Sequence, residues 1–116
     1  MIIDLEKIAY TRAGDKGAHS NVGVIFKSAE IYEWAKSNIN SDIVKKHFKE
    51  IVKGDVVRYE LPNLNAFNFI LHDSLGGGGS GSLLNDAQGK THGQAMLLMK
   101  VDIPINLLES LDEQLS

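Results

Sequence analysis

The sequence contains no cysteine and only two prolines. The absence of cysteine excludes a disulfide-stapled scaffold, a thiolate metal site and a cysteine nucleophile. No apolar run approaches the ~20 residues that a membrane-spanning helix requires. Basic residues are outnumbered, with 12 Lys and Arg against 15 Asp and Glu and a net charge of −3, which argues against a broad nucleic-acid-binding surface. We therefore expect a protein that binds neither nucleic acid nor membranes.

The length of 116 residues and the apolar fraction of 43% fit one globular domain with its own core. The N-terminal sequence MIIDLEKIAYTR lacks the basic start and long apolar stretch of a signal peptide, which predicts a cytoplasmic protein. We divide the chain into a domain over residues 1–104 and a tail over residues 105–116. The tail carries four leucines, more apolar surface than a monomer needs to expose, which predicts a homo-oligomer.

Two hydrophobic periods alternate along the chain. The period of two predicts strands over residues 3–11, 21–27, 55–61 and 94–103. The helical period predicts helices over residues 29–39 and 42–52. Residues 64–71 fit both periods, and we favour a short helix there.

This order of elements predicts an α+β fold, in which the two longer helices pack on one face of a mostly antiparallel, four-stranded sheet. The predicted core includes Val22, Val24, Ile31, Trp34, Phe48, Ile51, Val57, Tyr59, Leu97, Met99 and Val101.

The loop predicted over residues 11–20 combines glycine with basic side chains. Glycine lets main-chain N–H groups turn inward toward an anion, and Arg or Lys adds the charge that a carboxylate or phosphate requires. The candidate ligand-binding residues here are Arg12, Gly14, Lys16, Gly17, Ser20 and Asn21. Spacing alone favours an ordinary solvated hairpin loop, because the segment matches neither a P-loop nor a GxGxxG element.

A second loop, residues 74–82, contains four consecutive glycines. Ordering such a run is entropically costly, so it indicates either a flexible connection or close approach to a ligand. We predict that this loop lies beside residues 12–21 and that the two form one anion-binding pocket. Two further residues, Asn68 and Gln94, are expected to orient the neutral part of the ligand. The glycines concerned are Gly76, Gly77, Gly78 and Gly79.

The catalytic residues are unknown from sequence. Asp15 and His19 are candidates for moving a proton because they lie in the first glycine-containing loop. No histidine pair has the spacing of a helical metal site, so we expect neither a metal nor a cofactor. No GxSxG element and no evident acid–base pair is present.

Three sequence segments together resemble a known family. They are RAGDKGAHSNVGV, RYELPNLNAFNFIL and LGGGGSGSLLNDAQGKTHGQA. In the same order they are similar to the small C-terminal domain of acyclic terpene utilisation proteins of the AtuA type, over roughly residues 3–104. The resemblance implies a ferredoxin-like α+β fold and a role in bacterial breakdown of branched terpenoid acids through acyl-CoA intermediates. It also implies a separately encoded large AtuA-type partner, because larger members of the family carry a big N-terminal domain before this one.

Three functions remain open at this point. The first is a small subunit or accessory domain of an enzyme that degrades branched carboxylic acids, whose glycine-rich loops help to bind a small anionic or CoA-linked ligand. The second is an autonomous lyase or hydratase, in which Arg12 and Lys16 hold the anion. The third is a non-catalytic oligomerisation module.

Overall fold

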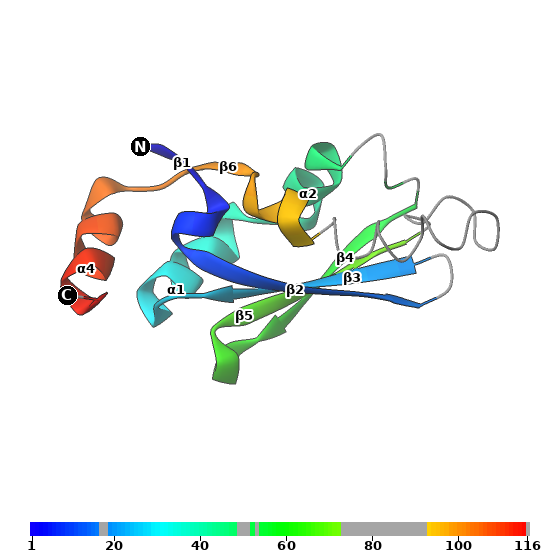
Figure 1. Ribbon diagram of the computed structural model, residues 1–116, viewed down its shortest axis with the longest axis horizontal. Helices are drawn as coiled ribbons and strands as arrows, with labels where there is room; N and C mark the ends of the chain where they lie inside the picture. The colour runs from blue at the N-terminus through cyan, green and yellow to red at the C-terminus, as the bar shows by residue number, and fades with distance from the viewer. Residues whose placement is uncertain (17–18, 49–51, 53, 73–92, 116) are drawn as a thin grey trace.

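A computed structural model describes residues 1–16, 19–48, 52, 54–72 and 93–115 of the chain. Its centre is an antiparallel sheet of four strands in the order β2-β3-β5-β4 (Figure 1). The strands are β2 (Ala9–Lys16), β3 (His19–Phe26), β4 (Val56–Leu61) and β5 (Ala66–Leu71). The expected α+β fold with a four-stranded antiparallel sheet is therefore confirmed.

The strand that completes this sheet is not the predicted one. Residues 66–71, for which we favoured a helix, form β5, and Phe67, Phe69 and Leu71 are fully buried on one face of it. Asn65 supplies the tight turn before β5 by adopting a left-handed φ of 51°. The period of two was the correct one here because one side of the segment packs into the core.

Residues 94–103 were predicted as one strand, and this prediction is wrong. Residues 93–97 are helical, and only β6 (Lys100–Asp102) is extended. β6 pairs with β1 (Ile2–Asp4) in a separate two-stranded sheet. Residues 3–11 likewise do not form one strand, because the 3₁₀ turn η1 (Leu5–Lys7) separates β1 from β2.

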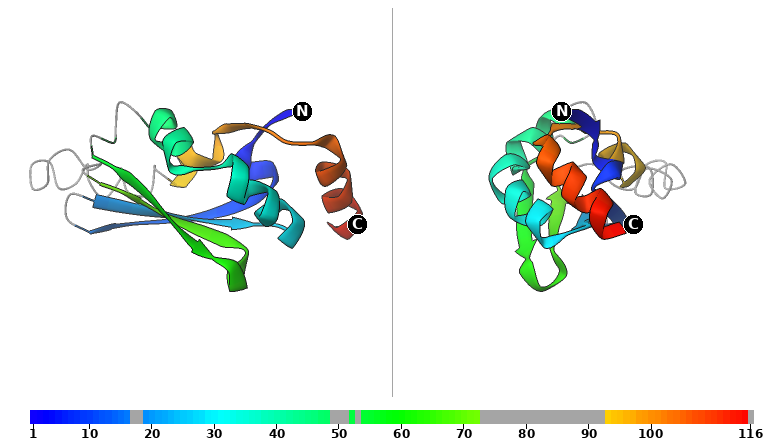
Figure 2. Two further views of the ribbon diagram at one scale, coloured as in Figure 1. Left: turned by 180° about the vertical axis from the view of Figure 1, so that it is seen from behind. Right: turned by 90° about the vertical axis from the view of Figure 1, so that its left-hand side faces the viewer.

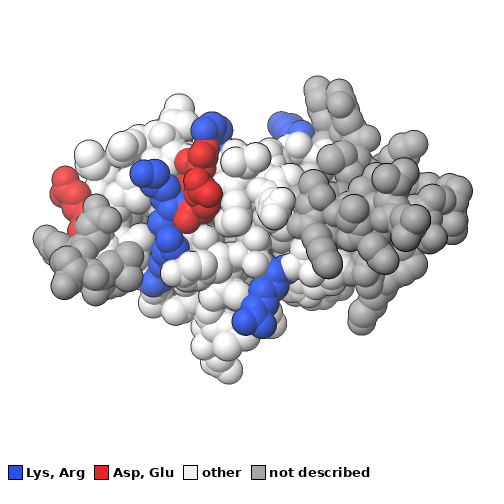
Figure 3. Space-filling view, viewed as in Figure 1, with Lys and Arg blue, Asp and Glu red and all other residues white. Residues whose placement is uncertain are grey.

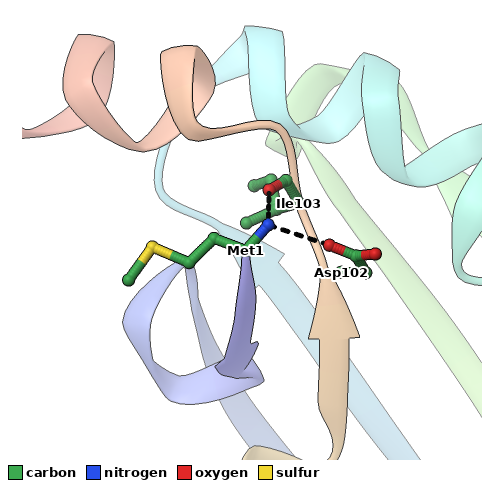
Figure 4. Close-up of polar contacts among 3 residues, drawn as sticks. All are labelled: Met1, Asp102 and Ile103. Atoms are coloured by element: carbon green, nitrogen blue, oxygen red, sulfur yellow. Dashed lines mark hydrogen bonds and ion pairs between the residues drawn. The ribbon is translucent and has the colours of Figure 1, made fainter.

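Polar contacts hold the small β1–β6 sheet together at its outer end. The Met1 amino group donates to the Asp102 carboxylate at 2.9 Å and to the Ile103 carbonyl at 3.0 Å (Figure 4). Asp4 and Lys100 face each other in the register and form an ion pair. Such exposed pairs contribute little to stability, so the buried Ile3 and Val101 beside them hold the two strands more firmly.

The loop predicted over residues 11–20 is mostly strand. Register pairs run from Ala9 with Phe26 to Lys16 with His19, so β2 and β3 form a hairpin almost to its tip. Thr11 donates a hydrogen bond of 3.0 Å from Oγ1 to the Gly93 carbonyl. This contact docks the helix at residues 93–97 against the inner face of β2.

All described helices lie on one side of the four-stranded sheet, as Figures 1 and 2 show. α1 (Ala29–Asn38) begins at Ser28, whose side chain accepts a hydrogen bond from the Ile31 amide. α2 (Ser41–His47) begins at Asn40 in the same way and ends earlier than the predicted residue 52. α4 (Ile105–Leu115) crosses the end of the molecule beside α1.

Three of the four tail leucines pack into the chain's own core. Leu111 is buried, and Leu107 and Leu108 pack against the core cluster. The leucine-rich tail therefore gives no support to the predicted homo-oligomer, which stays a prediction. Among the described residues, no helix is long and apolar enough to cross a membrane.

Aromatic rings form the centre of the core. The Phe67 ring lies 5.2 Å from that of Phe26 and 5.3 Å from that of Tyr32, between centroids. Most predicted core positions are correct, but Tyr59 is 54% exposed, because its side of β4 faces away from the helices. Trp34, Val57 and Leu97 are only half-buried, and Ile51 lies outside the described residues. The other predicted core residues are buried, namely Val22, Val24, Ile31, Phe48, Met99 and Val101.

Candidate functional site

The face of the sheet opposite the helices carries the candidate site. On β3, Val22, Val24 and Phe26 are buried under the helices, so the alternate residues point the other way. The register extends this assignment to the other three strands. We call these outward residues the open face: Tyr10, Arg12, Gly14, His19, Asn21, Gly23, Ile25, Val57, Tyr59, Leu61, Ala66, Asn68 and Ile70.

The open face has an unusual composition for a sheet surface in contact with water. The outward side of an antiparallel sheet ordinarily alternates to polar and charged residues. Here the open face contains no Asp or Glu, and Tyr10, Tyr59 and Leu61 are 61%, 54% and 40% exposed. In the view of Figure 3, red and blue side chains lie together over η1 and the β1–β6 pair, and the surface that protrudes at η2 (Pro62–Leu64) is white. This composition is typical of a surface that another molecule covers.

Two neighbouring rows of the open face bring the sequence-predicted residues together. Residues opposite one another on adjacent strands lie about 5 Å apart. Across the four strands, one row contains Arg12, Gly23, Asn68 and Tyr59. The next row contains Gly14, Asn21, Ile70 and Val57.

A hydrogen bond joins the two rows. The Asn21 side-chain NH₂ group donates to the Asn68 side-chain oxygen at 3.3 Å. One such bond between two carboxamides uses one oxygen and one NH₂ group, whichever way the amides are turned. Among the described residues, the Asn21 oxygen and the Asn68 NH₂ group have no further partner. The pair therefore offers one acceptor and one donor to a ligand.

A pocket of about 300 Å³ lies at this end of the sheet. Four of its lining residues belong to the open face, namely His19, Asn21, Asn68 and Ile70, and Ser20 completes the described lining. The His19 ring meets the His72 ring edge to face, with 4.8 Å between centroids. The described lining contains no Asp, Glu, Lys or Arg, and its side chains other than Ile70 can form hydrogen bonds, so it suits the uncharged polar part of a ligand.

Arg12 is the cation among the open-face residues whose side chains the structure describes. Its side chain is exposed, and Gly23 separates it from Asn68 in the same row. Gly14 lies under the Asn21 side chain, since a Cβ there would come within 3.0 Å of the Asn21 oxygen. A strand glycine at such a place permits a close neighbour, so residue 14 is small because Asn21 occupies the space above it.

The structure separates some of the predicted ligand residues from this group. Ser20 lines the pocket, but it is 2% exposed and its position in β3 turns its side chain to the helix side of the sheet. Gln94 is exposed in the helix at residues 93–97, where a Cβ on Gly93 would lie 3.2 Å from Ala13 on the inner face. Gln94 is therefore not brought together with Asn21 and Asn68.

The remaining predicted residues are only partly described. Asp15 and Lys16 form the end of β2. Gly17 and the loop with Gly76, Gly77, Gly78 and Gly79 lie outside the described residues, as does its predicted contact with residues 12–21. The anion pocket between the two loops stays a prediction.

Sequence analysis missed three members of the site. His72 and Ile70 were assigned no role, and Gly23 was not considered. A strand assignment for residues 66–71 would have placed Ile70 and His72 on the same side as Asn68. Within the described part of the chain, no three His, Asp or Glu side chains are placed to hold a metal ion.

A comparison with protein-family models matches the AtuA ferredoxin-like domain over residues 3–102. The chain belongs to this family. The match confirms the resemblance that the three sequence segments indicated. No curated protein and no solved structure matches the chain. The AtuA ferredoxin-like domain thus associates the chain with terpene utilisation proteins of the AtuA type, and its sheet agrees with the fold that the family name states.

Proposed function

We propose that this chain is an accessory domain of an AtuA-type enzyme that degrades branched carboxylic acids as acyl-CoA derivatives. It binds a separately encoded large AtuA-type protein and supplies part of a site for a small anionic or CoA-linked ligand. Family membership connects the chain with the large protein. The observation that carries the proposal is the pocket beside Asn21 and Asn68, which has hydrogen-bonding groups but no carboxylate among its described lining residues.

The chemistry of the open face divides the ligand into two parts. Arg12 would bind a carboxylate or a phosphate through its guanidinium group, which presents two parallel donors. The Asn21–Asn68 pair would bind a group that has both an acceptor and a donor, such as the secondary amides of a CoA arm. His19, which lines the pocket, is the one described candidate for proton transfer.

Binding and positioning fit these residues better than autonomous catalysis does. General acid–base catalysis requires a positioned acid or base matched to a reacting atom, and efficient sites usually pair such groups. Among the described residues that line the pocket, His19 is the one side chain of an acid–base type, and no carboxylate lines the pocket with it. We therefore assign the chemical step to the large protein, and substrate positioning to this domain.

Co-expression tests the proposal. The chain, carrying an affinity tag, is produced together with the large AtuA-type protein of the same organism, and the purified material is analysed by size-exclusion chromatography. We expect one peak that contains both proteins. Separate elution of the two proteins at micromolar concentration would contradict the accessory role. The tagged chain mixed with an unrelated acyl-CoA-binding protein is the control.

A further inference from the structure

We propose that two copies of this chain pair through their open faces, about a two-fold axis parallel to the strands. The open face contains exposed Tyr10, Tyr59 and Leu61, no acidic residue, and no described helix to cover it. Two sheets packed face to face, with their strands nearly aligned, are a common way to bury such a surface.

The register shows which residues such an axis brings together. Rotation about an axis parallel to the strands leaves each residue's position along the strand unchanged, so every row faces the same row of the second copy. It also reverses the strand order, so that β2 faces β4 and β3 faces β5. Arg12 then lies opposite Tyr59 of the second copy, and Gly23 lies opposite Asn68 of the second copy.

The facing residues complement each other in size and charge. A guanidinium group opposite an aromatic ring is a favourable arrangement. A second row, nearer the helical turn η2, contains Tyr10, Ile25, Ala66 and Leu61. There the large Tyr10 would meet Leu61 of the second copy, and Ile25 would meet the small Ala66 of the second copy. An axis perpendicular to the strands would instead lay β2 over β2 and gather both Arg12 side chains over the same pair of strands, which like charges disfavour.

Gly23 gives this arrangement an independent basis. It lies in the middle of central strand β3, where glycine is unfavourable. The other described glycines have an internal reason, because a Cβ at Gly14, Gly54 or Gly93 would meet another atom within 3.2 Å. A Cβ at Gly23 would meet only the Arg12 carbonyl oxygen, at 3.6 Å, an ordinary contact. The Asn68 side chain of the second copy needs this space.

The second copy also completes the pocket. Asn21, Asn68 and Ile70 line it and belong to the open face, so the facing sheet forms its opposite wall. The Asn21–Asn68 pairs of the two copies then lie on either side of the axis and both face the enclosed pocket. This last consequence rests on the proposed ligand site, whereas the pairing itself does not depend on any ligand or on the large protein.

Light scattering on the purified full chain is the first test. We expect twice the chain mass of 12.7 kDa at micromolar concentration. Tyr59→Lys should halve that mass, because it sets a cation against Arg12. R12E combined with Y59K should restore the dimer, since the exchanged charges again face each other. Leu98→Lys, at a residue that is 60% exposed outside the open face, is the control and should stay dimeric. A wild-type chain of 12.7 kDa would overturn the proposal, and so would a Y59K variant that stays dimeric.

Cross-linking tests the direction of the axis. The chain has no cysteine, so R12C and Y59C each carry one thiol. A bis-maleimide that spans the roughly 10 Å between stacked sheets should join R12C to Y59C in a mixture of the two variants. Each variant alone should cross-link at least fivefold less, because equal positions lie about three strand spacings apart. Equal cross-linking of R12C alone would overturn the parallel axis. Failure of the large protein to co-purify would contradict only the proposed function.

Discussion

Asn21 and Asn68 are 47 residues apart in the sequence, yet their side-chain amides share a hydrogen bond of 3.3 Å on the open face. The bond joins the two central strands, β3 and β5, between two rows of the sheet. Because the amides satisfy each other only in part, the pair combines local order with a donor and an acceptor that have no other partner among the described residues. This relationship places the candidate site on the side of the sheet that the described helices leave uncovered.

The Asn21–Asn68 bond should matter more for binding than for stability. Asn68→Ala is expected to lower the free energy of unfolding by about 0.5–1 kcal/mol, because the bond is neutral and only partly buried. The same change should weaken binding of coenzyme A to the complex with the large protein about tenfold. Urea unfolding and calorimetric titration measure the two effects. Asn63→Ala, at an exposed turn residue, is the control, and equal loss of binding in both variants would contradict the assignment.

Removal of the Arg58 side chain and removal of the Arg12 side chain should have different effects on stability and on anion binding. Arg58 donates from Nη1 to the carbonyls of Lys36 and Ile39, each at 3.0 Å, and lies 4.5 Å above the Phe67 ring. Arg58→Ala should therefore cost about 3 kcal/mol of stability. Arg12→Ala should leave the stability of the folded chain almost unchanged, since exposed charges contribute little. It should weaken anion binding by about 1.5–3 kcal/mol.

Thermal unfolding followed by circular dichroism checks the arginine pair. It should be recorded at several chain concentrations, so that any contribution from self-association is separated from the stability of the fold. Loss of stability in R12A comparable to that in R58A would show that Arg12 has a structural role instead.

The Tyr32 hydroxyl is expected to destabilise the fold. It is buried and, among the described residues, has no hydrogen-bond partner. An unpaired buried hydroxyl costs about 1–3 kcal/mol, so Tyr32→Phe should raise the free energy of unfolding by about 1 kcal/mol. The melting temperature should rise by about 4 °C. Tyr59→Phe removes a hydroxyl from a 54% exposed ring and should change neither value. A lower melting temperature for Y32F would reveal a partner for the hydroxyl.

Gly54 is required by the close approach of the main chain. A Cβ at this position would lie 2.8 Å from the His72 carbonyl oxygen, to which the Gly54 amide donates at 3.0 Å. Gly54→Ala must push these segments apart and should cost about 1–3 kcal/mol. Asp55→Ala removes only a surface ion pair with Lys45 and should cost less than about 1 kcal/mol. Chemical denaturation of both variants decides whether the backbone contact is as tight as described.

The sequence predicts the elements that are amphipathic with one clear period. β3 and α1 agree with it because each has a single buried side and clear end signals, such as the Ser28 cap. β4 forms where it was predicted, but its predicted buried side is the outward one, since Val56 is buried and Tyr59 is 54% exposed. Residues 66–71 fit two periods, and only the neighbouring strands decide between them. Residues 93–97 alternate in sequence but form a helix, because Gly93 docks on Ala13 of β2. Tertiary contacts of this kind cannot be inferred from local periodicity.

The candidate site was predictable in its residue types and not in its geometry. Arg12, Asn21 and Asn68 were chosen as ligand residues, and the structure places all three on the open face. Their setting differs from the expected one, since Arg12 lies on a strand and not in a loop, and Asn68 lies on a strand and not in a helix. Gly23 and Ile70 could not be found, because their importance depends on the register between strands.

The most direct test of the account is a calorimetric titration of coenzyme A into three samples: the purified chain, the large AtuA-type protein, and their co-purified complex. The accessory role predicts that the complex binds coenzyme A at least tenfold more tightly than either protein alone. It also predicts that Arg12→Ala in the complex removes most of this gain, while Lys46→Ala, at an exposed lysine of α2, leaves it intact. Equal affinity of the complex and the isolated large protein would contradict a ligand site shared between the two proteins.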